Sequence, residues 1–105
     1  MGLFGLFKTK DIDEGVKDFK ATNGAVLLDV RTPEEYREGH IEGSRNIPLQ
    51  EIGQAAVIKD KSTPLFVYCR SGGRSASATA QLKRMGYTHA NDIGGIAFYN
   101  GKVVR

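Results

Sequence analysis

Cysteine is the scarcest reactive residue in this chain, which contains a single one, Cys69, among 105 residues. One cysteine excludes an internal disulfide, a CxxC redox pair and a resolving cysteine, so sulfur or an oxidation product on Cys69 must be removed by another molecule. A lone free thiol is typical of a reducing compartment, and we expect the cytoplasm. Two histidines and one cysteine lack metal-ligand spacing, so we expect no metal and no other cofactor.

The chain also lacks a large excess of one charge and any long apolar run. The net charge is only +3, and aromatic residues are not interleaved with the basic ones, which disfavours nucleic-acid binding. The apolar start, residues 1–7, is far shorter than the ~20 residues that span a bilayer and lacks the features of a secretory signal. We expect these residues to pack on the domain or on a neighbouring copy, and contact with a partner protein or a membrane surface is the alternative. We assign residues 1–9 to an N-terminal extension and residues 10–105 to one globular domain.

Short apolar runs alternate with helical patterns along that domain. The strand patterns cover residues 25–30, 44–49, 65–68 and 90–93, and the helical patterns cover residues 11–23, 32–39, 49–58, 74–85 and 96–99. Asp11 followed by Glu14 resembles a capping box, with Asp11 as the N-cap of the first helical pattern. The clearest helix start is Thr-Pro-Glu-Glu at 32–35, which combines a capping box with an N-terminal proline. The alternation predicts an α/β fold with a mainly parallel sheet, and a ligand site beyond the carboxyl ends of its strands, where Cys69 falls.

The segment Cys-Arg-Ser-Gly-Gly-Arg-Ser, residues 69–75, joins a buried strand pattern to a helix. Its two glycines permit the positive φ angles of a tight curl, so that successive N–H groups face one point beside a helix N-terminus. We expect the Cys69 sulfur at that point, with a pKa lowered from the usual value of about 8.5. Cys69 is therefore the predicted nucleophile, and an inert core cysteine is the alternative.

The remaining loop residues are candidates to bind the substrate or a group carried on Cys69, namely Arg70, Ser71, Gly72, Gly73, Arg74 and Ser75. The two arginines suit an anionic donor, although Arg74 is almost as well explained as a support for the loop. Ser71 and Ser75 are candidates to contact the sulfur, and for Ser75 a helix-capping role is equally open.

Asp29 and Arg31 lie near the end of another strand pattern, at the same sheet edge as Cys69. We expect them to form a structural ion pair or a loop anchor near the site, and a catalytic role is the alternative. His40 is expected to make a structural hydrogen bond, and His89 is expected to be solvated.

Four blocks in chain order resemble the rhodanese family: Leu-Leu-Asp-Val-Arg-Thr-Pro-Glu-Glu-Tyr at 27–36, Gly-His-Ile-Glu-Gly-Ser-Arg-Asn-Ile-Pro at 39–48, Tyr-Cys-Arg-Ser-Gly-Gly-Arg-Ser at 68–75, and Gly-Gly at 94–95. The resemblance implies an α/β sheet of about five strands with helices on both faces. It also implies sulfurtransferase chemistry through a Cys69 persulfide, with a small anionic donor such as thiosulfate and with cyanide or a thiol as acceptor. The family's tryptophan after the paired glycines is absent, and Phe98 and Tyr99 stand near its place.

The length of the loop separates two reactions. Cys69 and Arg74 enclose four residues, whereas a cysteine phosphatase of the C-x5-R type encloses one more. The shorter loop favours one added sulfur atom over a phosphate, and the resemblance favours the same choice. We predict double displacement with ping-pong kinetics. The alternative from another class is an interaction module that carries a persulfide to a dedicated partner protein.

Overall fold

Strand β4, Leu65–Cys69, is buried at every residue and lies between two parallel neighbours. The computed structural model describes residues 11–105. Its main sheet has the order β3-β1-β4-β5, in which β1 is Val26–Asp29, β3 is Ser44–Asn46 and β5 is Ala90–Gly95. All the pairings in this sheet are parallel, so the carboxyl ends of the strands, including that of Cys69, meet at one edge.

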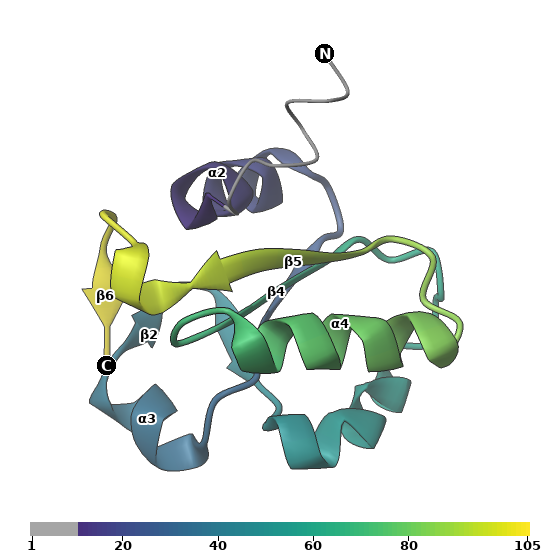
Figure 1. The fold of residues 1–105 in the computed structure, drawn as a ribbon. Coiled ribbons are helices and arrows are strands. Elements are labelled where there is room, and N and C mark those ends of the chain that lie inside the picture. The colour runs from purple at the N-terminus through teal and green to yellow at the C-terminus, as the bar shows by residue number, and fades with distance from the viewer. Residues whose placement is uncertain (1–10) are drawn as a thin grey trace, which may run out of the picture.

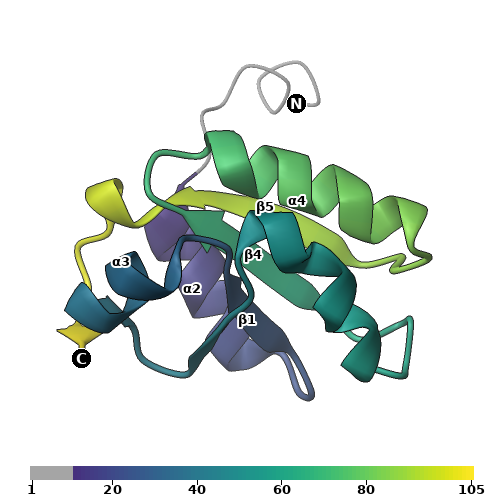
Figure 2. The same cartoon turned by 90° about the horizontal axis from the view of Figure 1, so that it is seen from below.

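Helices cover both faces of the main sheet, as Figures 1 and 2 show. Helix α2, Ile12–Ala21, lies on one face, while α4, Gly73–Arg84, and the 3-10 helix η1, Leu49–Val57, lie on the other. Because side chains alternate along a strand, β4 serves two cores. Leu65, Val67 and Cys69 pack with α4 and η1, whereas Phe66 and Tyr68 pack with α2.

Two helix starts were predicted from local sequence, and both are confirmed. Asp11 caps α2 by accepting hydrogen bonds from the N–H groups of Asp13 and Glu14, at 3.1 and 3.4 Å. Thr32 and Glu35 form the reciprocal capping box of α3, Pro33–Glu38. These short-range contacts satisfy N–H groups that a helix leaves unpaired at its first turn.

The sheet differs from the expectation of about five strands in one assembly. Four strands form the parallel sheet, and two very short strands, β2 (His40–Ile41) and β6 (Val103–Val104), form a separate antiparallel pair. Two-residue strands are too short to show a periodic apolar pattern, so sequence reasoning could not find them. The helix expected at 49–58 is of 3-10 type and is interrupted at Glu51.

Strand β5 contains a bulge opposite the end of β4. Val67 pairs with Asp92, but the next residue, Tyr68, pairs with Gly94, so that Ile93 is extra in the ladder. Ile93 packs on the α2 side, where Gly15 allows a close approach: a Cβ at Gly15 would lie 2.6 Å from the Ile93 Cγ2. The bulge therefore resets which side chains of β5 face α4 just before the sheet edge.

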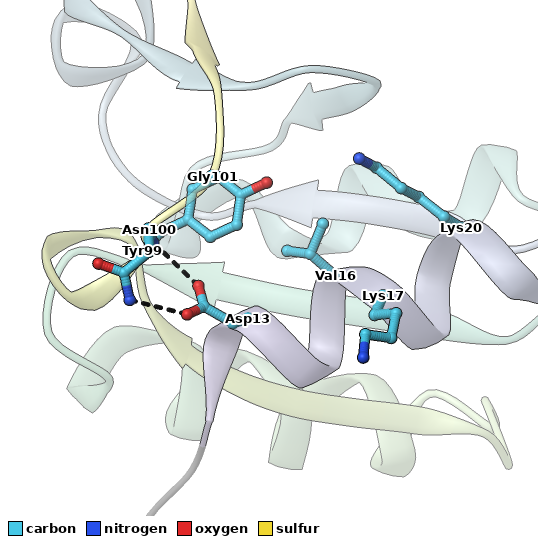
Figure 3. A pocket seen from close by; sticks show the side chains of 7 residues that line it. All are labelled: Asp13, Val16, Lys17, Lys20, Tyr99, Asn100 and Gly101. Carbon is cyan, nitrogen blue, oxygen red and sulfur yellow. Dashed lines mark hydrogen bonds between the residues drawn. The ribbon is translucent and has the colours of Figure 1, made fainter.

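The C-terminal segment returns to α2 after the short 3-10 helix η2, Ile96–Phe98. The Asp13 carboxylate accepts hydrogen bonds from the Asn100 backbone N–H at 2.9 Å and from its side-chain amide at 2.8 Å (Figure 3). Beside this contact is a hollow of about 350 Å³, whose lining includes Val16 and Tyr99 but not Cys69. Within residues 11–105, no helix has the length and apolar character needed to cross a bilayer. The expectations for residues 1–9 fall outside the described part of the chain.

Candidate active site

Cys69 occupies the last position of β4, and the strand alternation turns its side chain toward α4. The residue is only 1 % exposed. The loop after it curls back, because Gly72 adopts φ = 114° and directs its N–H to the Cys69 Sγ at an N···S distance of 3.0 Å. The side chain is thus as buried as a core cysteine, but its sulfur receives a polar contact from the loop backbone.

The hydrogen bonds around the sulfur outweigh its burial. Burial raises the pKa of Cys69, while contacts with the Ser75 hydroxyl and with the backbone N–H groups of Ser75, Gly72 and Ser71 lower it. The net result is a pKa below that of an ordinary cysteine. This environment favours the thiolate, the form in which cysteine acts as a nucleophile.

The two loop arginines have different surroundings. The Arg74 guanidinium binds both carboxylate oxygens of Glu35, at 2.7 and 3.0 Å, which fits the loop-support interpretation of Arg74. Arg70 is exposed, and no ion pair within residues 11–105 engages its side chain. Arg70 is therefore the cation of the loop that is available to an incoming anion.

Glu35 has a role at the site that sequence reasoning missed. Besides capping α3, its carboxylate holds Arg74, which lies 39 positions later in the chain. The Arg74 hydrogen bond lowers the pKa of Glu35 to about 2, with further support from Thr32. The available signal was the glutamate pair that begins α3, because this short helix starts at the same sheet edge as the loop.

Ser75 is fully buried in the first turn of α4, and its Oγ lies 3.4 Å from the Cys69 Sγ. The same oxygen lies 2.7 Å from the Asp92 Oδ1. Asp92 was not predicted, since the strand pattern gives no indication that the bulge in β5 places a carboxylate beside the loop. Of the other loop residues, Ser71 and Gly73 are exposed, and Gly73 begins α4.

The paired glycines at the end of β5 let this strand pack tightly on the loop. A Cβ at Gly95 would collide with the Arg70 carbonyl oxygen and would lie 2.7 Å from the Ser71 Cα. The Arg70 carbonyl instead accepts a hydrogen bond from the Ala97 N–H at 3.0 Å. The end of β5 thus fixes the position of the loop that surrounds the sulfur.

Asp29 and Arg31 form the expected ion pair, which is buried at the same sheet edge. The Arg31 guanidinium donates to the Asp29 carboxylate at 2.7 Å and to the Gly39 carbonyl, also at 2.7 Å. The Asn46 amide donates to the carbonyl oxygens of both residues at 2.9 Å. These contacts anchor the segment that leads from β1 into α3.

The two histidines lie in surroundings that match their expected roles. The His40 ring stacks on Tyr36 with centroids 3.7 Å apart, and its Nδ1 lies 2.8 Å from the Tyr36 carbonyl oxygen. His89 is exposed. Across residues 11–105, no three histidine, cysteine or carboxylate side chains gather in a way that could hold a metal ion.

Comparison with known proteins identifies relatives of this chain. A family model described as a rhodanese-like domain matches residues 10–100. Thiosulfate sulfurtransferase PspE of Escherichia coli is 42 % identical over 71 residues, which cover 66 % of this chain and 68 % of that protein. Thiosulfate sulfurtransferase GlpE of Ectopseudomonas mendocina is 35 % identical over 74 residues, covering 70 % of this chain and 68 % of that protein.

Solved structures show the same fold. A structure described as a rhodanese with anions from E. coli has a TM-score of 0.71 and 37 % sequence identity, and it covers 77 % of this chain and 98 % of its own. The human single-domain sulfurtransferase TSTD1 has a TM-score of 0.70 and 29 % identity, with coverage of 81 % and 88 %. The similarity therefore includes both sequence and fold.

Proposed function

Because this chain belongs to the rhodanese-like domain family, we propose that it is a thiosulfate sulfurtransferase whose Cys69 carries the transferred sulfur as a persulfide. The observation that carries the proposal is the contact from the Gly72 N–H to the Cys69 Sγ at 3.0 Å, in a loop that lowers the pKa of the thiol. A charged sulfur held by backbone N–H groups is a prepared nucleophile. The relatives PspE and GlpE, which are named as thiosulfate sulfurtransferases, supply the donor class.

The first step loads the enzyme. The Cys69 thiolate attacks the outer sulfur of thiosulfate, a sulfur–sulfur bond forms, and the bond to the sulfonate sulfur breaks with its electron pair leaving on sulfite. Arg70 is exposed at the loop and approaches the dianionic donor, while Arg74 stays bound to Glu35 and keeps the loop in shape.

The second step discharges the enzyme. The negative charge of the persulfide lies on its outer sulfur, which is stabilised by N–H groups of the loop from Arg70 to Ser75. Cyanide or a thiol attacks that sulfur, and the electron pair of the broken bond returns to the Cys69 Sγ as a thiolate. Since the two substrates react in separate steps, the kinetics should be ping-pong.

Intact-mass measurement after incubation with thiosulfate tests the proposal. The wild-type chain should gain about 32 Da, the mass of one sulfur, and should lose it on addition of cyanide. The Cys69→Ser variant, which keeps a hydroxyl at that position, should gain nothing and should form no thiocyanate. A wild-type chain that gains no mass, or one that releases phosphate from an aryl phosphate, would contradict the assignment.

An exposed aromatic residue favours the second candidate, a persulfide carrier that serves a partner protein. Phe98 is 68 % exposed in η2, whose Ala97 is hydrogen-bonded to the loop through Arg70. A partner that covers Phe98 would reach the loop directly.

A carrier should load sulfur to one equivalent but discharge slowly to cyanide, whereas an enzyme should do both fast. Deleting residues 1–7 should leave thiosulfate turnover unchanged if the chain is an enzyme.

A further inference from the structure

The Ser75 hydroxyl stands between two groups that compete for its single proton. A hydroxyl has one hydrogen to donate and lone pairs with which to accept. The Ser75 Oγ lies 2.7 Å from the Asp92 Oδ1 and 3.4 Å from the Cys69 Sγ, and the carbonyl oxygens of Gly72 and Gly94 are at 3.1 and 3.4 Å. The carboxylate is both charged and nearest, so the proton goes to Asp92.

Asp92 is held in place for this contact. Its Oδ1 also accepts the Gly94 N–H at 3.1 Å, and the bulge in β5 separates these two residues by the extra Ile93. With its proton directed mainly to Asp92, Ser75 presents chiefly a lone pair to Cys69. A lone pair suits a thiol hydrogen, whereas the Cys69 thiolate keeps only a weakened hydrogen bond from the Ser75 hydroxyl.

This competition has unequal effects on the two charged states of Cys69. In the free thiolate the charge lies on Sγ, next to the Ser75 oxygen. In the persulfide Sγ carries two covalent bonds and no charge, while the charge lies on the outer sulfur. The exchange Cys69–S⁻ + S₂O₃²⁻ ⇌ Cys69–S–S⁻ + SO₃²⁻ conserves atoms and charge and involves no proton. The hydrogen bond that Asp92 draws away from Sγ would therefore stabilise the free thiolate more than the persulfide.

We propose that Asp92 is a positioning residue that holds the Ser75 proton away from Cys69 and so biases the enzyme towards its sulfur-loaded state. This inference rests on the proposed function, because the loaded state is the Cys69 persulfide. Removing the carboxylate returns the Ser75 proton to the thiolate. The expected result is a less occupied persulfide at a fixed ratio of thiosulfate to sulfite.

The test uses Asp92→Asn in the full chain and two measurements. The pH midpoint of alkylation by iodoacetamide should fall by about one pH unit, which is tenfold more thiolate well below the midpoint, because a neutral amide is a weaker acceptor than the carboxylate and leaves the Ser75 proton to the thiolate. The persulfide fraction, read by intact mass at fixed thiosulfate and sulfite and at a pH above the wild-type midpoint, where unloaded Cys69 is the thiolate, should fall severalfold. Asp92→Ala also removes the carboxylate and should shift both measurements in the same direction.

Asp60→Asn is the matched control. Asp60 makes the same kind of contact with a serine hydroxyl, since its Oδ1 lies 2.6 Å from the Ser62 Oγ, but it is exposed in the connector before β4. This variant should change neither measurement. A control shift as large as that of Asp92→Asn would overturn the inference, because the effect would then not depend on Ser75.

A second comparison separates the hydroxyl from the charge alone. In a Ser75→Ala background, Asp92→Asn should produce less than half of its usual alkylation shift. A shift of half or more overturns the inference, as does an alkylation midpoint that is unchanged or raised by Asp92→Asn alone. A wild-type chain that takes up no sulfur overturns the proposed function and this inference together. Normal wild-type loading with an undiminished loaded fraction in Asp92→Asn overturns only this inference.

Discussion

Replacing Gly95 by alanine would push the end of β5 against the reactive loop. The new Cβ would meet the Arg70 carbonyl oxygen and would lie 2.6 Å from its carbon, whereas ordinary van der Waals contacts begin near 3.4 Å. Backbone atoms provide this contact, so it cannot be relieved by turning a side chain. The loop must therefore move by about 1 Å, and such overpacking costs about 1–3 kcal/mol of stability.

The same movement should weaken the thiolate. If the Gly72 N–H moves by about 1 Å from the Cys69 Sγ, little of its hydrogen bond remains. A hydrogen bond to a charged group contributes about 1.5–3 kcal/mol, so the pKa of Cys69 should rise by about one to two units. At a pH below the wild-type midpoint, the thiolate fraction and kcat/KM for thiosulfate should both fall about tenfold to a hundredfold.

Iodoacetamide alkylation across pH measures the midpoint directly, and urea unfolding measures the stability. The control is Gly53→Ala in η1, where a Cβ meets nothing within 4 Å and the glycine does not adopt positive φ. This control should change neither the alkylation midpoint nor turnover. A folded Gly95→Ala chain with the wild-type midpoint would refute the claim that contact with β5 keeps the loop amides on the sulfur.

Three further substitutions test the supports of the site. Arg74 lowers the pKa of the Glu35 carboxylate from 4.5 to about 2, so the stability that this carboxylate contributes is fully present above about pH 4.5 and is lost as the pH falls through 2. In Glu35→Gln, the free energy of unfolding in urea should depend less on pH over this range, and an unchanged dependence would contradict the prediction. Asp29→Asn should cost about 3–5 kcal/mol in urea unfolding, because Arg31 is left buried without its anion, and a loss below about 1 kcal/mol would show that the pair is not an anchor. Tyr87→Phe should cost about 1–3 kcal/mol by the same assay, since the buried tyrosine hydroxyl has its one hydrogen between the carbonyl oxygens of Ala55 and Ile58, at 2.8 and 2.6 Å; a variant as stable as wild type would contradict this.

Features set by neighbouring residues were predictable from the sequence. The capping box of Thr32 and Glu35 and the cap at Asp11 depend on contacts within three positions, and both were expected where they occur. The apolar run before Cys69 indicated a buried strand, and the following glycines indicated a curled loop. Strand alternation then determines which face Cys69 shares with Val67, a result that needs only the strand boundaries.

Features that depend on distant residues were not predicted. The contact between Glu35 and Arg74 exists because α3 and the loop meet at one sheet edge, and its one local signal is the glutamate pair that begins α3. Asp92 reaches Ser75 because of a bulge, and an added residue in a ladder leaves no mark on a short apolar pattern. The short pairing of β2 with β6 likewise follows from where the chain end returns.

The shared face of β4 has a consequence for how this protein tolerates change. Cys69 belongs to the same packed cluster as Val67, Ala78 and Leu82, so the atom that reacts also fills the interior. A substitution that repacks this cluster also shifts the position of the Cys69 sulfur. Interior substitutions far from any substrate should therefore alter reactivity together with melting temperature, and the two properties cannot be adjusted independently from this side of the sheet.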